Sequence, residues 1–150
     1  MSLPKNRTLT INKLFDAPLS VVWNAWTDPK HLVKWWAPKG MDVTIIEHNF
    51  SVGGVWKYSM PMPNGDSFIS EGTYLEIIPN EKIVTTADFK PMTTNVEIHV
   101  LFEEDGDKTK FTFSVLHETE EYCKQQEEMG FYNGWGSTLD RFAETLQSFL

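Results

Sequence analysis

The chain has 150 residues, 41% of them hydrophobic, and a formal net charge of -8 at pH 7. This length supports a substantial core, and no linker or composition break divides the chain, so we expect a single domain over residues 1–150. The acidic charge excludes proteins that bind phosphate backbones, because these need clustered Lys and Arg, and we expect no nucleic-acid partner. No apolar run approaches the length that spans a bilayer, so we expect no membrane insertion.

Apolar and polar residues alternate over residues 8–15, which predicts a half-buried strand. The next stretch, 17–40, holds four of the six tryptophans in two short helical segments. Pro18 suits the first turn of the first helix, and Asp28 with Pro29 ends it and starts the second. Each helix has one wide apolar face, which we expect to cover an apolar core.

A series of further strands is predicted after these helices, because apolar residues alternate again and turn residues bound each run. These strands span residues 43–48, 55–62, 68–78, 83–89, 96–102 and 110–117. The clearest turns are Gly53-Gly54, the stretch 63–66 and the stretch 104–107, which joins the last two strands as a hairpin. With the strand at 8–15, the total is about seven.

From Thr119 onward the apolar residues fall at steps of three and four, which predicts one long helix to the end of the chain. Thr119 suits its N-terminus, because a hydroxyl side chain can cap the free N–H groups. Gly130, Gly134 and Gly136 are unusual inside a helix, since each costs about 1 kcal/mol relative to alanine. Close approach of the helix to the sheet is the simplest explanation, and a break or kink near Gly130 is the alternative.

This order of elements predicts an α+β fold, in which a curved antiparallel sheet wraps the C-terminal helix and two short helices follow the first strand. The inner face of the sheet collects many large apolar side chains. They are Trp56, Tyr58, Met60, Val96, Ile98, Val100, Phe102, Phe111, Phe113 and Val115. Two arrangements remain open at this point: a cavity between sheet and helix, or a core that these side chains fill completely.

A resemblance to a known family runs from about Thr8 to Leu150. It is carried, in order, by the segments LTINKLFDAPLSVVWNAWTDPKHLVKWWAPKG, FSVGGVWKY, EGTYLEIIPNEKIV and GWGSTLDRFAETL. These segments resemble the bacterial stand-alone members of the family named after the activator of the Hsp90 chaperone ATPase. That family is part of the START-like, helix-grip superfamily (SRPBCC), which includes the birch pollen allergen. The resemblance implies a deep cavity that often accepts hydrophobic ligands, and it implies no common catalytic residue.

The histidines His31, His48, His99 and His117 show no ligand-like spacing, so we expect no metal site. His117 shares the inner face of the last strand and is placed to reach the mouth of a cavity, whereas His99 is expected on the outer face. Gly53-Gly54 is a turn and not a phosphate loop, and we expect no cofactor.

Two other residues are weighed as catalytic groups. Glu71 lies in the middle of a strand, where a buried carboxylate would have a raised pKa, but an exposed or ion-paired side chain is favoured. Cys123, the single cysteine, lies in the charged stretch 120–128, and we expect a surface or half-buried thiol and not a nucleophile. With one cysteine no internal disulfide can form, and no signal peptide is visible, so we expect a cytoplasmic protein.

The favoured function is a small soluble protein that binds a hydrophobic or aromatic small molecule, with no catalytic residue assigned. Its predicted ligand-binding residues are Trp56, Tyr58, Met60, Phe113, His117, Trp135 and Leu139. One alternative is a cofactor-free enzyme of the aromatase, cyclase or hydratase kind, with His117 or Glu71 as the proton carrier. Another is a chaperone-associated or other protein-partner module. An exposed tryptophan face at Trp35 and Trp36 would support a homodimer.

Overall fold

The computed structural model describes residues 3–37, 42–61, 65–90 and 93–149. Within these residues, seven antiparallel strands form one sheet in the order β1-β7-β6-β5-β4-β3-β2. The strands are β1 (Thr8–Phe15), β2 (Thr44–His48), β3 (Val55–Pro61), β4 (Ser67–Ile78), β5 (Lys82–Lys90), β6 (Thr93–Asp105) and β7 (Lys108–Leu116). The α+β fold and each predicted strand are confirmed. The predicted turn at 63–66 and the end of the tryptophan segment at 38–40 lie largely outside the described residues.

The helices are η1 (Lys5–Arg7), α1 (Leu19–Thr27), α2 (Pro29–Leu32), α3 (Glu120–Glu128) and α4 (Phe131–Gln147). The two short helices after the first strand are therefore confirmed. Side-chain caps begin two of the helices, because the oxygen of Asp28 accepts from the backbone N–H of Lys30 and that of Thr119 accepts from Tyr122. None of the helices in the described part of the chain is long and apolar enough to cross a membrane.

The prediction of one uninterrupted helix from Thr119 is wrong, and the alternative of a break near Gly130 is confirmed. Gly130 has φ 100°, in the left-handed region, and lies between α3 and α4. A glycine adopts this conformation without the steric cost that other residues bear. The expected close approach of the helix to the sheet is also wrong, since a Cβ added at Gly134 or Gly136 would have no atom within 4 Å.

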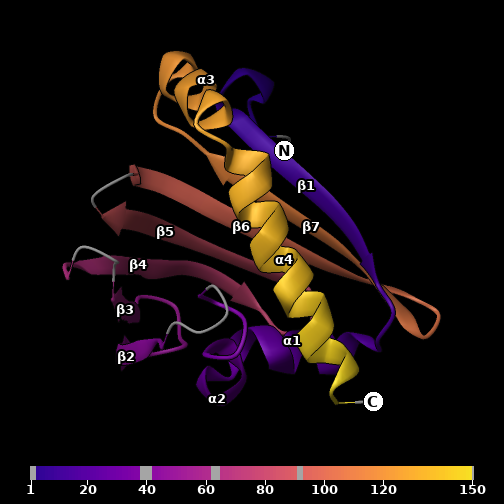
Figure 1. Ribbon diagram of the computed structural model, residues 1–150. Helices are drawn as coiled ribbons and strands as arrows, with labels where there is room; N and C mark the ends of the chain where they lie inside the picture. The colour runs from indigo at the N-terminus through magenta and orange to yellow at the C-terminus, as the bar shows by residue number, and fades with distance from the viewer. Residues whose placement is uncertain (1–2, 38–41, 62–64, 91–92, 150) are drawn as a thin grey trace.

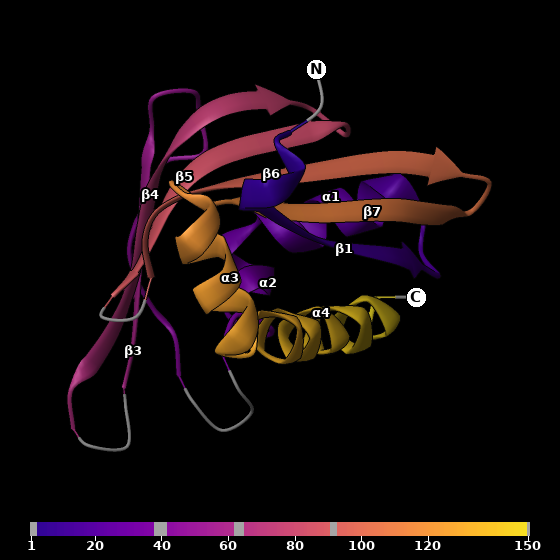
Figure 2. The same cartoon turned by 90° about the horizontal axis from the view of Figure 1, so that it is seen from above.

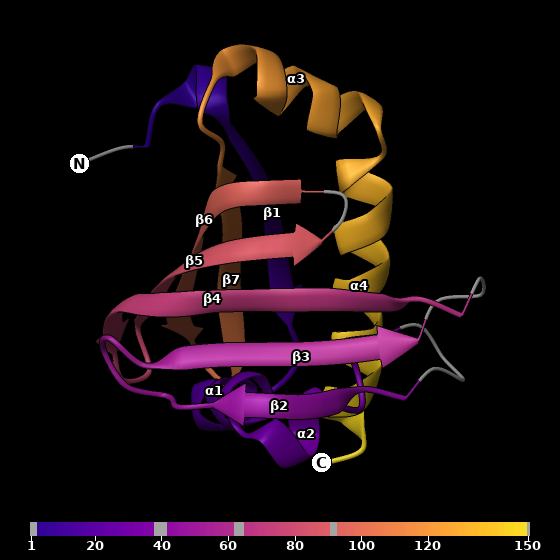
Figure 3. The same ribbon diagram turned by 90° about the vertical axis from the view of Figure 1, so that its left-hand side faces the viewer.

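The sheet bends so strongly that β1, β7 and β6 form one side and β4, β3 and β2 the other, with α4 crossing the concave face (Figures 1 and 2). Figure 3 shows α3 at one end of this arrangement and α1 with α2 at the other. The inner face of the sheet is apolar, as predicted. Its buried residues include Trp56, Tyr58, Val96, Ile98, Val100, Phe102, Phe111, Phe113 and Val115. Met60, near the end of β3, stays partly exposed.

Trp35 and Trp36 are both turned toward the protein interior. Trp35 is fully buried, and its Nε1 donates a hydrogen bond to the carbonyl oxygen of Ala25 at 2.9 Å. Trp36 is partly buried and meets Trp56 and Tyr58 edge-on, with 5.8 and 5.3 Å between the ring centroids. The apolar helical face therefore covers the core here, as expected, and the exposed tryptophan face that would have supported a homodimer is not found at Trp35 and Trp36. A homodimer stays a prediction without support from this surface.

Candidate functional site

A pocket of about 510 Å³ lies between the concave face of the sheet and the helices α3 and α4. Strands β3 to β7 contribute one wall, and α4 contributes the other through one helical face. The apolar lining consists of Trp36, Met60, Phe68, Phe89, Val96, Val115, Phe131 and Trp135. The polar lining consists of Ser70, His117, Gln126, Ser137, Thr138 and Arg141, with Gly134 beside them. The site is thus mainly apolar with a few polar groups, as small-molecule sites usually are.

A second, much smaller void of about 30 Å³ lies deeper in the hollow, toward α1. Trp36 and Trp135 line both spaces, so these two indole rings separate them. Their ring centroids are 6.1 Å apart, and Phe89 meets Trp135 at 5.4 Å. Aromatic side chains therefore fill much of the hollow near α1, and the larger pocket lies near α3.

The predicted ligand-binding residues are divided between these two spaces. Met60, His117 and Trp135 line the large pocket. Trp56, Tyr58 and Phe113, together with Trp135, line the small void. Leu139 lines neither space and is fully buried in the core. Whether any of them binds a ligand stays a prediction.

Sequence reasoning missed several lining residues, of which Trp36, Phe89 and Arg141 matter most for the chemistry. Gly134, Thr138 and Arg141 follow one another at steps of four and three along α4. This spacing places them on one helical face, and it is the signal that could have identified Arg141.

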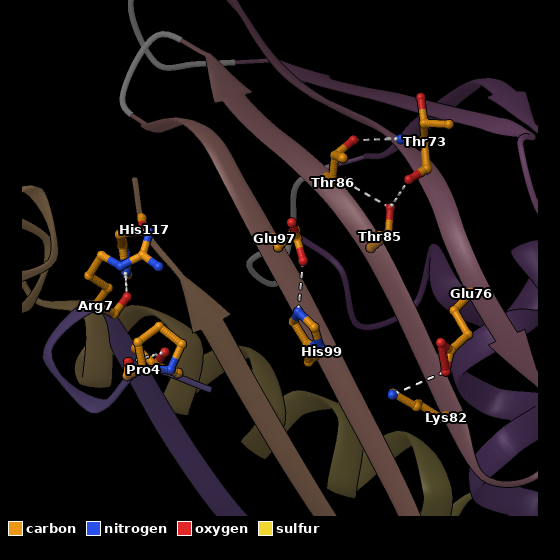
Figure 4. A network of polar contacts seen from close by, with 11 residues as sticks. Pro4, Arg7, Thr73, Glu76, Lys82, Thr85, Thr86, Glu97, His99 and His117 are labelled. Carbon is orange, nitrogen blue, oxygen red and sulfur yellow. Dashed lines mark hydrogen bonds and ion pairs between the residues drawn. The ribbon is translucent and has the colours of Figure 1, made fainter. Parts of the chain in front are cut away.

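His117 follows β7 and is held by the backbone of Arg7. The N–H of His117 donates to the carbonyl oxygen of Arg7 at 2.8 Å, and its ring Nδ1 lies 3.1 Å from the same oxygen (Figure 4). Because a carbonyl oxygen only accepts, Nδ1 carries the hydrogen, and Nε2 holds the lone pair of the neutral ring. Burial lowers the pKa of His117, against a smaller opposing effect of the bond to Arg7. His117 is thus a neutral group in the pocket wall at neutral pH.

Arg141 is fixed in the pocket wall by two hydrogen bonds. Its Nε donates to the carbonyl oxygen of Trp35 at 3.4 Å, and its Nη2 donates to Oγ1 of Thr138 at 3.1 Å. Burial lowers the pKa of Arg141 and the charge of Glu144 opposes this shift, but a guanidinium stays protonated in proteins. Among the described residues that line the pocket, Arg141 is the single Lys or Arg, and none is Asp or Glu.

The other weighed residues lie outside the pocket. Glu71 forms an ion pair with Lys57 at 3.7 Å, as the favoured prediction of an exposed or ion-paired side chain expects. Glu71 does not line the pocket. His99 lies on the outer face of β6, where its Nε2 is 2.9 Å from a carboxylate oxygen of Glu97 (Figure 4). Within the described ranges, no group of three or more His, Cys, Asp or Glu side chains is placed to hold a metal ion.

Cys123 differs from its prediction as a surface or half-buried thiol. Its residue is only 4% exposed, because α3 turns this side chain toward the core. Burial raises the pKa of the Cys123 thiol, and the charges of Glu127 and Glu120 raise it further. The raised pKa reduces the thiolate fraction, so this geometry does not favour a nucleophile.

Solved structures with the same fold come from several bacteria. A protein of Nitrosomonas europaea matches with 25% sequence identity and a TM-score of 0.83, over 97% of each chain. A protein of Arthrobacter aurescens matches with 25% identity and a TM-score of 0.84, over 98% of this chain and 91% of its own. A protein of Rhodobacter sphaeroides has a TM-score of 0.88 at 15% identity, over 99% and 98% of the two chains, which shows the fold alone. A comparison with curated proteins finds no match.

The family model described as Activator of Hsp90 ATPase homolog 1-like protein matches residues 16–147. The match runs from the end of the first strand to the end of α4 and so covers nearly all the elements that surround the pocket. The curved sheet around a terminal helix is the START-like, helix-grip arrangement expected for this family. The chain therefore belongs to the Activator of Hsp90 ATPase homolog 1-like protein family.

Proposed function

We propose that this protein binds a hydrophobic or aromatic small molecule in the pocket between the sheet and α4. The observation that carries the proposal is the open space of about 510 Å³ beside a wall of aromatic side chains. Sites for small ligands typically have volumes of about 300–1,000 Å³ and mostly apolar walls. Covering such a wall with an apolar molecule removes its surface from water, which is favourable by about 25 cal/mol for each Å².

Gly134 supports the same proposal. It lies in the pocket lining, and a Cβ at this position would meet no atom within 4 Å. A glycine in a helix costs about 1 kcal/mol relative to alanine, so its presence needs a reason. Close packing against the sheet is not that reason, because no atom lies within 4 Å of the Cβ position. Room for an occupant beside the helix backbone does explain it.

Tryptophan fluorescence tests the proposal, because Trp36 and Trp135 stand in the pocket wall. We expect members of a panel of lipids and aromatic metabolites to change the emission in a saturable way. Gly134→Leu should weaken binding at least about tenfold, because its side chain would occupy the pocket. The matched control is Gly136→Leu, since Gly136 has equal room for a Cβ but does not line the pocket.

Two outcomes would contradict the proposal. The first is the absence of any response across the panel in the wild-type protein. The second is equal weakening by Gly134→Leu and Gly136→Leu, which would mean that ligands bind elsewhere or that both variants act through folding.

The cofactor-free enzyme stays a second candidate on one observation, the neutral His117 in the pocket wall. A neutral imidazole with Nε2 as an acceptor can serve as a general base. Glu71, the other proton carrier considered, is paired with Lys57 away from the pocket. His117→Asn keeps an N–H donor near the position of Nδ1 and removes the base, so unchanged turnover of any substrate found would contradict this candidate. The cytoplasmic location and the chaperone-associated role remain predictions.

A further inference from the structure

The charge inside the pocket is opposite in sign to that of the protein. The whole chain has a formal net charge of -8. Yet the pocket lining, as far as the structure describes it, holds the guanidinium of Arg141 and no carboxylate. His117, the other titratable side chain of the lining, is neutral at neutral pH, because burial lowers its pKa against the smaller opposing effect of its bond to Arg7. The pocket therefore has one positive charge without a counter-charge in its own wall.

The hydrogen bonds of Arg141 leave part of its guanidinium available. A guanidinium has five N–H donors, and the bonds to Trp35 and Thr138 use one on Nε and one on Nη2. Among the described residues no ion pair is formed with Arg141; the carboxylate of Glu144, three residues along α4, acts on it through its charge. Both partners of Arg141 are neutral oxygens, so they orient the side chain and do not neutralise it.

We infer that the occupant of this pocket carries one carboxylate, which pairs with Arg141, on an aliphatic or aromatic body that packs against Trp36, Phe89 and Trp135. This inference rests on the proposed function. A planar guanidinium matches a carboxylate through two parallel hydrogen bonds, and such charge-assisted bonds are about twice as strong as neutral ones. A single cation inside an acidic protein can pair with one negative charge of a ligand. Further negative charges on the ligand would be repelled by the acidic groups of the protein, so a polyanion is disfavoured.

Isothermal titration calorimetry at pH 7.5 tests the inference with two matched pairs of probes. The aliphatic pair is laurate, below its micellar concentration, and methyl laurate; the aromatic pair is 2-naphthoate and methyl 2-naphthoate. Each methyl ester keeps the apolar body and lacks the charge. In the wild-type protein we expect at least one acid to bind about tenfold or more tightly than its ester.

Two variants of Arg141 assign the difference to this side chain. Arg141→Gln should raise the Kd of the acid about tenfold or more and change that of the ester less than about twofold. Arg141→Lys keeps the charge without the planar fork and should give an intermediate Kd. Thermal unfolding of each variant, and the ester Kd itself, show that the pocket is still formed.

The outcomes separate this inference from the proposed function. If esters bind as tightly as acids, or if Arg141→Gln leaves acid binding unchanged, the carboxylate inference is overturned and the apolar pocket remains. If none of the four probes binds to the wild-type protein, the inference is overturned, and silence of the wider fluorescence panel would then remove the proposed function as well.

Discussion

The imidazole ring of His48 joins the hydroxyl group of Tyr58 to the end of helix α1. Its Nε2 lies 3.1 Å from the carbonyl oxygen of Thr27, and its Nδ1 lies 2.7 Å from the Tyr58 hydroxyl. Since the carbonyl oxygen only accepts, Nε2 carries the hydrogen and Nδ1 accepts the hydrogen of Tyr58. The neutral form of His48 therefore satisfies both partners. Protonation would place a second N–H on Nδ1, so the Tyr58 hydroxyl could no longer donate to the ring and would have to accept from it.

Stability should fall on mild acidification because of His48 and His117. Burial lowers the pKa of both residues, although the carbonyl of Thr27 and the charge of Asp28 partly oppose this for His48. An unfolded histidine has a pKa of about 6.5, so below this pH the unfolded chain binds more protons than the folded one. The free energy of unfolding should be fully retained above about pH 6.5 and decrease as the pH falls toward the lowered folded pKa values. Urea unfolding at pH 7.5, 6.5 and 5.5 measures this.

Variants separate the two contributions. Gln at position 48 can still donate to Thr27, and Asn at position 117 can still donate to Arg7, so each keeps the main hydrogen bond without a titrating ring. His48→Gln and His117→Asn should each lessen the loss between pH 7.5 and 5.5, and the double variant should nearly remove it. A double variant that is as pH-sensitive as the wild-type protein would assign the effect to other groups.

The strands could be predicted from the sequence because their signals are local. In β1 the observed bounds, Thr8–Phe15, are those predicted, since alternation of side chains defines a strand without knowledge of its neighbours. The signal for the turn at Gly106 and Asp107 is equally local, because a glycine readily adopts the positive φ of 64° found at Gly106. This two-residue turn connects Asp105 to its pairing partner Lys108.

The helix break and the pocket wall depend on tertiary contacts, so the sequence alone did not define them. Helical residues continue on both sides of Gly130. In α3, as the structure describes it, Cys123 is the one buried residue, so the apolar pattern is too weak to predict where α3 ends and α4 begins. Trp35 and Trp36 are neighbours with the same apolar character, yet one is buried in the core and the other lines the pocket. Arginine is usually a surface residue, so the sequence gives no reason to expect Arg141 in a pocket. The position of α4 over the sheet is what places it in the pocket wall.

Gly130→Ala should destabilise the protein. Gly130 has φ 100° at the junction of α3 and α4, a conformation that costs other residues about 1–2 kcal/mol. We therefore expect a loss of about 1–2 kcal/mol in the free energy of unfolding, measured by urea denaturation. Unchanged stability would mean that α3 and α4 can join in another backbone conformation.

Gly134→Ala and Gly136→Ala should have the opposite effect. A Cβ at either position meets no atom within 4 Å, and neither residue is among the glycines with positive φ in the described chain. Each substitution should stabilise the protein by about 0.5–1 kcal/mol, because alanine loses less backbone entropy than glycine in a helix. Urea denaturation of both variants measures the gain. A loss of stability at Gly134 alone would show that its backbone needs the freedom of glycine.

Trp135→Ala should join the large pocket to the small void, because the Trp135 ring separates them together with Trp36. The ring also packs against Phe113 with 4.5 Å between centroids, so its loss should cost about 3 kcal/mol of stability. Free indole should fill the new space and raise the Tm of this variant more than that of the wild-type protein. Leu139→Ala is the control, since its loss should cost comparable stability and Leu139 lines neither of the two spaces. Equal stabilisation of all three proteins by indole would contradict a shared wall at Trp135.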